Sequence, residues 1–126
     1  MNYSRQRELI YNALMNTQSH PTAETIYKQL RVDVPKLSLA TVYRNLNQLC
    51  DLGSARRLRI NGSPDRYDGV VKPHYHFCCE HCGDVCDVTI SESVINSLLS
   101  SEMGHSPTYC DVIFYGSCLK CKSENC

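Results

Sequence analysis

The chain has 126 residues and a formal net charge of zero at pH 7, with 13 Lys/Arg balanced by 13 Asp/Glu. This length allows one ordinary domain or two very small ones, and no apolar run is long enough to span a membrane. The polar N-terminus has no apolar segment behind it, so we expect no secretory signal and a cytoplasmic protein, in which the nine cysteines serve as metal ligands or reactive thiols.

The zero net charge conceals a division between the two halves of the chain. Residues 1–67 carry ten Lys/Arg and five Asp/Glu, whereas residues 68–126 carry three and eight. Eight of the nine cysteines lie between Cys78 and Cys126. A basic half joined to an acidic, thiol-rich half indicates two units, the first a candidate for binding nucleic acid and the second for binding metal.

Three helices are predicted in the first half. Residues 4–16 repeat apolar side chains at helical spacing behind Ser4, a possible N-cap. A second helix begins after Thr22, another plausible N-cap, and a third begins after Ser38 and ends at Gly53. Two short strands around an Asn61-Gly62 turn follow.

Three helices followed by a hairpin is the order of a winged helix, whose helix-turn-helix places its second helix in the major groove of DNA. The alternative is a plain three-helix core with a decorative hairpin, but the arginines of this half favour DNA. Tyr43 and Arg44 on the third helix are the candidates for reading bases. The candidates for phosphate contacts are Thr41, Arg56, Arg57 and Arg59.

The second half begins after a predicted hinge. We expect a winged-helix DNA-binding domain over residues 1–69, a hinge over 70–73 and a metal-binding dimerisation domain over 74–126. The pattern beyond the hinge predicts strand, strand, helix and strand, with the helix starting at Ser91 or Ser93, followed by a polar tail. Such a small α/β unit with exposed edges is expected to dimerise, and the fold class is α+β.

Two CxxC pairs each follow a predicted strand, Cys79-x-x-Cys82 and Cys118-x-x-Cys121. Two such turns can complete a tetrahedral four-cysteine site for structural Zn²⁺. A thioredoxin-like redox pair would need a βαβ setting that is missing from the pattern, and incidental thiols are the other alternative.

The other cysteines have simpler interpretations. Cys50 and Cys110 are expected to be small buried hydrophobes, and Cys126 is expected to be exposed near the end of the chain. We expect Cys78 and Cys86 to point away from the zinc turn.

Nitrogen and oxygen ligands form a second set. His74 and His76 are two residues apart on a predicted strand, so both rings leave the same face. Asp87 lies on the neighbouring strand, and Asp68 stands just before the hinge. Imidazole with two carboxylates favours Fe²⁺ or Mn²⁺, although a solvated surface face is the alternative for the histidine pair. The remaining histidines of this half are expected on the surface: His81 and His105.

Six motifs stand in a fixed order along nearly the whole chain: His20-Pro-Thr-Ala-Glu-x-Ile-Tyr27, Ser38-Leu-Ala-Thr-Val-Tyr-Arg-Asn-Leu46, Arg66-Tyr-Asp68, His74-Tyr-His76-Phe, Cys79-x-x-Cys82-Gly83 and Tyr115-Gly-x-Cys118-x-x-Cys121. In this order they resemble the ferric-uptake-regulator (Fur) superfamily. Within it, the sequence looks most like the peroxide-sensing (PerR-type) branch.

The resemblance implies a regulatory metal site with the ligands His20, Asp68, His74, His76 and Asp87. Aspartate at the last position marks the peroxide branch, where iron-sensing relatives usually carry glutamate. The resemblance also implies a homodimeric repressor, not an enzyme, that binds an inverted-repeat operator in double-stranded DNA. Peroxide would act through Fe²⁺-driven oxidation of a ligand histidine, His20 or His74. The alternative is a Fur-type regulator of iron, zinc or manganese uptake.

Two departures from the family stand out. Members usually have an extra helix ahead of the first one, whereas three residues precede Ser4 here. Tyr109 and Cys110 stand where the histidines of a third metal site often fall.

Outside the family, the alternatives are a zinc hydrolase or deaminase, a thiol oxidoreductase and a bare zinc-ribbon module. A catalytic zinc needs an open position and a general base, and His74-x-His76 stands in place of the deaminase His-x-Glu.

Overall fold

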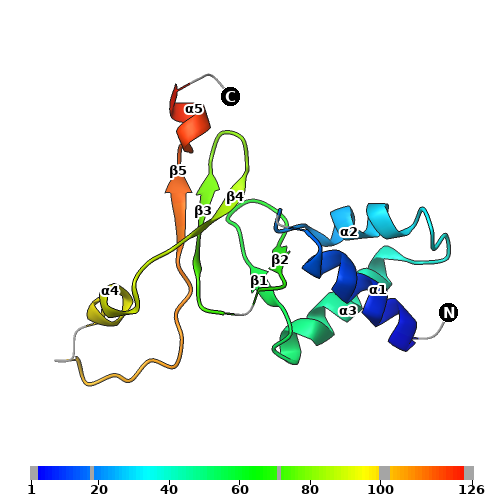
Figure 1. Ribbon diagram of the computed structural model, residues 1–126, viewed down its shortest axis with the longest axis horizontal. Coiled ribbons are helices and arrows are strands. Elements are labelled where there is room, and N and C mark those ends of the chain that lie inside the picture. Colours follow the sequence, from blue (N-terminus) through cyan, green and yellow to red (C-terminus); the bar gives the residue numbers. More distant parts are fainter. Residues whose placement is uncertain (1–2, 18, 71, 100–102, 124–126) are drawn as a thin grey trace. The chain divides into compact units, whose positions relative to one another are not determined.

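The computed structural model describes residues 3–17, 19–70, 72–99 and 103–123 (Figure 1). Contacts between residues divide the chain into two compact units, Met1–Lys72 and Pro73–Cys126. Helices dominate the first unit and a sheet the second, so the predicted α+β fold class is confirmed. Among the described residues, no helix combines the length and apolar composition needed to cross a membrane.

The first unit has three helices followed by a hairpin. The helices are α1 (Tyr3–Met15), α2 (Ala23–Leu30) and α3 (Leu39–Asp51). Strands β1 (Arg56–Leu58) and β2 (Arg66–Asp68) pair antiparallel. This is the predicted order of a winged helix, with β1 and β2 as the wing.

Side-chain caps start two of these helices where the sequence predicts them. The Oγ1 atom of Thr22 accepts a hydrogen bond from the Thr25 N–H at 3.1 Å, and the Oγ atom of Ser38 accepts one from Thr41 N–H at 3.1 Å. Each satisfies an amide that the first helical turn leaves without a partner. The predicted cap at Ser4 is wrong, because α1 already begins at Tyr3.

The core of the first unit lies between the apolar faces of the three helices and the base of the wing. Burying one large apolar side chain contributes roughly 1.5–3 kcal/mol, so this cluster is a main source of the unit's stability. Ile10 and Leu14 of α1, Ile26 of α2, and Val42 and Leu46 of α3 are all at most 2 % exposed. Tyr67 of β2, 1 % exposed, joins the same cluster.

The second unit is built on a three-stranded sheet in the order β4-β3-β5. Strand β3 (Tyr75–Cys79) pairs antiparallel with β4 (Val85–Val88) and parallel with β5 (Ile113–Gly116). Helix α4 (Glu92–Ser97) lies between β4 and β5 in the chain, and α5 (Leu119–Ser123) follows β5. The predicted order of strand, strand, helix and strand is confirmed, and Ser91 caps α4.

Three details differ from expectation, two of them in this unit and one, at Cys50, in the first unit. The segment after β5 forms α5, because Cys118 accepts one hydrogen bond from the Cys121 amide through its sulfur and another from the Lys122 amide through its carbonyl. Cys110 is exposed, since it precedes β5 in an irregular segment, and Cys50 of α3 is half-buried. The expectation for Cys126 lies outside the described residues.

Candidate metal centres and nucleic-acid interface

The two CxxC turns meet at one end of the three-stranded sheet. In the parallel β3–β5 register Cys79 pairs with Gly116, so the turn that follows β3 lies against the turn that follows β5. The sulfurs of Cys79 and Cys121 are 3.6 Å apart, and those of Cys82 and Cys118 are 3.9 Å apart. Zn–S bonds of about 2.3 Å in a tetrahedron separate the sulfurs by about 3.8 Å, so the spacing suits zinc.

Backbone amides converge on the first sulfur of this cysteine cluster. The Cys79 Sγ atom accepts hydrogen bonds from the N–H groups of Cys82, Cys118 and His81 at 3.5, 3.4 and 3.4 Å. These donors lower the pKa of Cys79 to about 6. A thiolate is the form of cysteine that binds metal. Because Cys121 is disulfide-bonded in this structure, metal binding at the cluster requires its reduction.

The pKa of the neighbouring thiol, Cys82, shifts in the opposite direction. A backbone hydrogen bond from Asp84 lowers the pKa of Cys82, but burial and the adjacent sulfurs of Cys79 and Cys118 raise it to about 11. Two thiolates at this spacing repel each other, so the proton stays on one of them. A bound cation would remove that repulsion, as expected for a cluster of metal ligands.

His81, which the sequence suggested was a surface residue, is exposed but has a specific partner. Its Nε2 atom lies 2.8 Å from the Oγ atom of Ser117. One residue belongs to the first cysteine turn and the other directly precedes Cys118. Sequence reasoning missed this contact because the two residues are 36 positions apart.

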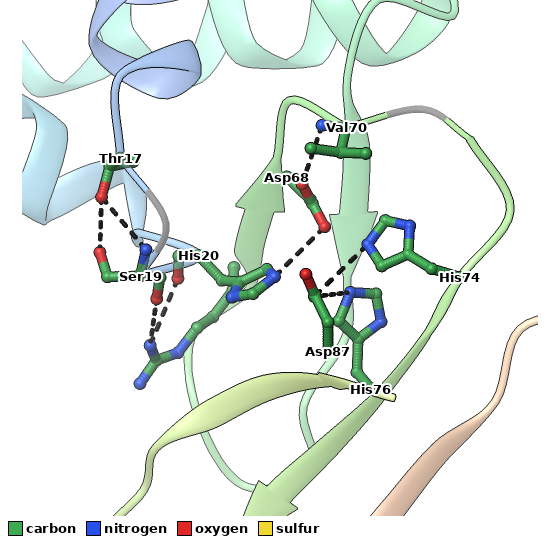
Figure 2. Close-up of polar contacts among 9 residues, drawn as sticks. Thr17, Ser19, His20, Asp68, Val70, His74, His76 and Asp87 are labelled. Carbon is green, nitrogen blue, oxygen red and sulfur yellow. Dashed lines mark hydrogen bonds and ion pairs between the residues drawn. The ribbon is translucent and has the colours of Figure 1, made fainter. Parts of the chain in front are cut away.

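The second unit also brings three nitrogen and oxygen ligands together. In the β3–β4 register His76 pairs with Asp87, and the Oδ1 atom of Asp87 lies 3.5 Å from the Nε2 atoms of both His74 and His76 (Figure 2). The two imidazole rings have centroids 4.6 Å apart. His76 is 2 % exposed and Asp87 is 57 % exposed, so a buried imidazole faces an accessible carboxylate.

The first unit holds two further candidate metal ligands, an imidazole and a carboxylate. The Nε2 atom of His20 lies 3.2 Å from the Oδ2 atom of Asp68, and both side chains are only 6 % exposed (Figure 2). The other carboxylate oxygen of Asp68 accepts a hydrogen bond from the Val70 N–H at 2.8 Å. The pair is therefore oriented by the end of β2 and by the loop that precedes α2.

The backbone at His20 adopts an unusual conformation. Its φ is 53°, in the left-handed region that residues other than glycine seldom occupy. The Nη1 atom of Arg66 donates to the carbonyl oxygens of Ser19 and His20 at 3.3 Å each, and the Tyr67 amide donates to Pro21 O at 2.9 Å. These bonds from β2 hold a conformation that costs of order 1–3 kcal/mol, which is typical of a functional position.

Each of these two groups has ligand types suited to Fe²⁺, Mn²⁺ or Zn²⁺. The first unit supplies two donors and the second three. Such ions take about four to six ligands, so neither group by itself fills a coordination shell.

The predicted DNA-contacting residues lie on α3 and the wing. On α3, Tyr43 is 38 % exposed and Arg44 is exposed, whereas Thr41 accepts from Ser38 Oγ at 2.8 Å within the helix cap. On the wing, Arg59 is exposed and Arg57 is half-buried. A further candidate, Arg56, is also half-buried on β1.

The sequence and the fold both have known relatives. Residues 1–114 match the family model described as "Ferric uptake regulator family". The peroxide-responsive repressor PerR of Staphylococcus epidermidis is 34 % identical over 120 residues, which cover 94 % of this chain and 80 % of that protein.

Solved structures agree with this match. The ferric uptake regulator Fur of Helicobacter pylori is similar with a TM-score of 0.86 at 25 % identity, over 100 % of this chain and 85 % of that one. The peroxide stress regulator of Campylobacter jejuni is similar with a TM-score of 0.79 at 26 % identity, over 94 % of this chain and 89 % of that one.

Proposed function

This chain belongs to the ferric uptake regulator family, and we propose that it is a metal-dependent DNA-binding repressor that senses peroxide. The proposal rests on one observation above all: each unit of the chain holds an incomplete set of nitrogen and oxygen ligands. His20 and Asp68 form a buried pair in the first unit, and His74, His76 and Asp87 form a triad in the second.

A single Fe²⁺ or Mn²⁺ ion would complete its shell by taking both sets. Within each set the carboxylate oxygen already lies within 3.5 Å of its histidine nitrogens, so little side-chain ordering is left for the ion to impose. An ion shared in this way couples the DNA-binding unit to the second unit. Shifting such an equilibrium from mostly open to mostly closed requires the ion to favour the closed form by about 5 kcal/mol.

A second ion, Zn²⁺, is proposed for the four cysteines Cys79, Cys82, Cys118 and Cys121. Its role is structural, because a shell of four thiolates leaves no position open for a substrate or an effector. The ion would contribute folding free energy and would not exchange with the regulatory metal.

DNA binding is proposed for α3 and the wing of a homodimer on an inverted-repeat operator. Arg44 suits the acceptor edge of guanine, and Tyr43 can contact a thymine methyl group. Thr41, Arg56 and Arg59 are proposed phosphate contacts, which fix the register of the protein without reading the sequence. The symmetry of a dimer requires two half-sites in the operator.

Peroxide sensing is proposed from the identity of the ligands and of the relatives. Asp87 stands where the peroxide-sensing branch carries aspartate, and the Staphylococcus epidermidis relative is a peroxide-responsive repressor. Bound Fe²⁺ supplies one-electron chemistry with H₂O₂ that Mn²⁺ in the same ligand set does not. The expected targets are His20 and His74.

The test of the shared ion is the substitution His20→Ala. It should abolish the Mn²⁺-dependent gain in DNA affinity while the protein keeps one zinc per chain. His105→Ala, which changes an exposed histidine outside both ligand sets, is the matched control. A His20→Ala protein that still gains DNA affinity with Mn²⁺ as the unsubstituted protein does would rule out the shared site.

An iron uptake regulator of the same fold is the second candidate, because the Helicobacter pylori ferric uptake regulator is structurally similar. Mass spectrometry of the Fe²⁺ form after H₂O₂ treatment separates the two. One added oxygen on a peptide containing His20 or His74, absent from the Mn²⁺ form, favours the peroxide sensor. Unmodified histidine peptides favour the iron regulator.

A further inference from the structure

Arg57 on β1 is a half-buried arginine of the wing, with 25 % of its side chain accessible. Its guanidinium group contacts residues from three different segments of the first unit. Asn47 comes from α3, Asp65 from the loop between the two strands and Tyr67 from β2. These contacts make Arg57 a side chain that joins the wing to the DNA-reading helix.

The contacts use different parts of the guanidinium group. Its Nη2 atom donates a hydrogen bond to Oδ1 of Asn47, and its Nε atom lies 3.6 Å from Oδ2 of Asp65. Its Cζ atom lies 5.9 Å from the centroid of the Tyr67 ring, close enough for a cation–π interaction. A planar fork of donors can serve several partners at once, which the single ammonium group of lysine cannot do with the same geometry.

The partner residues are themselves firmly placed. The β1–β2 register pairs Arg57 directly with Tyr67, which is 1 % exposed and belongs to the core of the unit. A hydrogen bond with Tyr67 also raises the pKa of Arg57. Asn47 stands near the C-terminal end of α3, on the same helix as Tyr43 and Arg44.

A phosphate contact would compete with these interactions. Asp65 already offsets the charge of the guanidinium, and Asn47 occupies one of its donors, so an approaching phosphate would have to displace both. Arg59, two residues further along the wing, is exposed and does not face this cost to the same extent.

We propose that Arg57 is a positioning residue that fixes the wing against α3, in place of the phosphate contact suggested by the sequence. This inference rests on the proposed DNA-binding function and adds to it the residue that sets the angle between the two DNA-contacting elements. With Arg57 in place, α3 and the wing meet the duplex as one pre-arranged surface. Without it, the wing has to be ordered when DNA binds.

The experiment measures binding of the full-length, Mn²⁺-loaded protein to a duplex selected from a random-sequence pool with the unsubstituted protein. Affinity is recorded over a range of KCl concentrations, because each phosphate contact contributes about 0.9 to the slope of log K against log salt. The variants are Arg57→Lys, Arg57→Ala and Asn47→Ala, and Arg59→Ala is the matched control on the same wing. Far-UV circular dichroism and the Tm establish that each variant is folded.

A positioning role predicts that both substitutions of Arg57 weaken binding by about fivefold to tenfold, the cost of ordering one segment on association. Arg57→Lys keeps the charge and should therefore keep the salt slope while losing affinity. Asn47→Ala removes no charge and should also weaken binding at an unchanged slope. The double variant Asn47→Ala/Arg57→Ala should bind no more weakly than Arg57→Ala, whereas Arg59→Ala should lower the slope by about 0.9.

Two results would overturn the inference. One is that Arg57→Lys binds like the unsubstituted protein while Arg57→Ala lowers the salt slope by about 0.9, which identifies a phosphate contact. The second test needs no DNA. If Arg57 holds the wing, hydrogen exchange at the Leu58 amide of β1 should be about fivefold faster in Arg57→Ala and in Asn47→Ala. Unchanged exchange in both variants would show that the contacts do not hold the wing, and it would overturn the inference. If the unsubstituted protein selects no duplex, the proposed function fails, and hydrogen exchange still decides the role of Arg57.

Discussion

The imidazole of His81 links the two cysteine turns of the second unit. Its Nε2 atom lies 2.8 Å from Ser117 Oγ, beside a main-chain hydrogen bond from Glu80 N–H to Gly116 O at 2.7 Å. The two bonds join the same pair of turns, one through side chains and one through the backbone. Groups that hold metal ligands in place without touching the metal typically change metal affinity or activity by roughly 10- to 100-fold.

We therefore expect His81→Ala and Ser117→Ala each to speed the loss of zinc to a chelator by about tenfold. The measurement is the rate of zinc release, followed with a chromophoric chelator under reducing conditions. His105→Ala is the control, because that exposed histidine lies outside the cysteine turns. Equal release rates in all these proteins would show that the side-chain link does not retain the ion.

The low pKa of Cys79 gives a second test at this scale. In the reduced, metal-free protein its thiolate should form with a midpoint near pH 6, below the ordinary value of 9.0, because backbone amides from Cys82 and Cys118 stabilise the charge. The stabilisation from this ionisation is complete above the unfolded pKa and is lost as the pH falls through about 6. Ultraviolet titration should detect the low-pH thiolate and should lose it in Cys79→Ser.

At the level of elements, a side-chain cap decides where α3, the proposed DNA-reading helix, begins. Ser38 Oγ accepts from the Thr41 amide at 3.1 Å and donates to the Thr41 hydroxyl oxygen at 2.8 Å. The start of α3 is therefore held by a side chain that precedes it. Arg44, a proposed base-reading residue, reaches the same hydroxyl at 3.5 Å.

Ser38→Ala should lower the free energy of unfolding by about 1 kcal/mol, because it leaves the first amides of α3 without their cap. Urea unfolding followed by circular dichroism measures the change. Ser63→Ala serves as the control, since Ser63 lies in the exposed turn between the strands of the wing. A loss at Ser38 no larger than at Ser63 would mean that water replaces the cap at no cost.

At the scale of the whole molecule, the two units differ in how they are stabilised. The first unit has a continuous core formed by three helices and Tyr67. The buried apolar residues of the second unit are few among those that the structure describes: Tyr75, Cys78, Cys79 and Val85. One of these, Cys79, is itself a proposed zinc ligand, so we expect the stability of the second unit to depend on the cysteine cluster.

Zinc removal should therefore unfold the second unit before the first. With a strong chelator and a reductant present, we expect the strand signal in circular dichroism to fall while most of the helical signal from α1, α2 and α3 is retained. Cys118→Ser should give the same pattern without a chelator. Loss of both signals in a single transition would show that the units depend on each other for folding.

Local features of both units could be predicted from the sequence. Caps at Thr22 and Ser38, the hairpin around Asn61-Gly62 and the β3–β4 hairpin depend on side chains within a few residues of one another, where propensity and spacing act directly. The types of the candidate ligands follow in the same way, because a CxxC turn and a histidine pair on one strand are local patterns. Helix ends were predicted less well. Helix α1 begins at Tyr3, before the predicted cap, and α5 forms where a polar tail was expected.

The order of the elements, the division of charge and the side chains available as ligands can be derived from the sequence alone, since these are properties of short segments. Which segments meet depends on the fold. The parallel pairing of β3 with β5 brings the two cysteine turns together, and the packing of the wing against α3 surrounds Arg57 with Asn47 and Asp65. Contacts between residues far apart in the chain depend on the packing of whole elements, which local spacing does not encode.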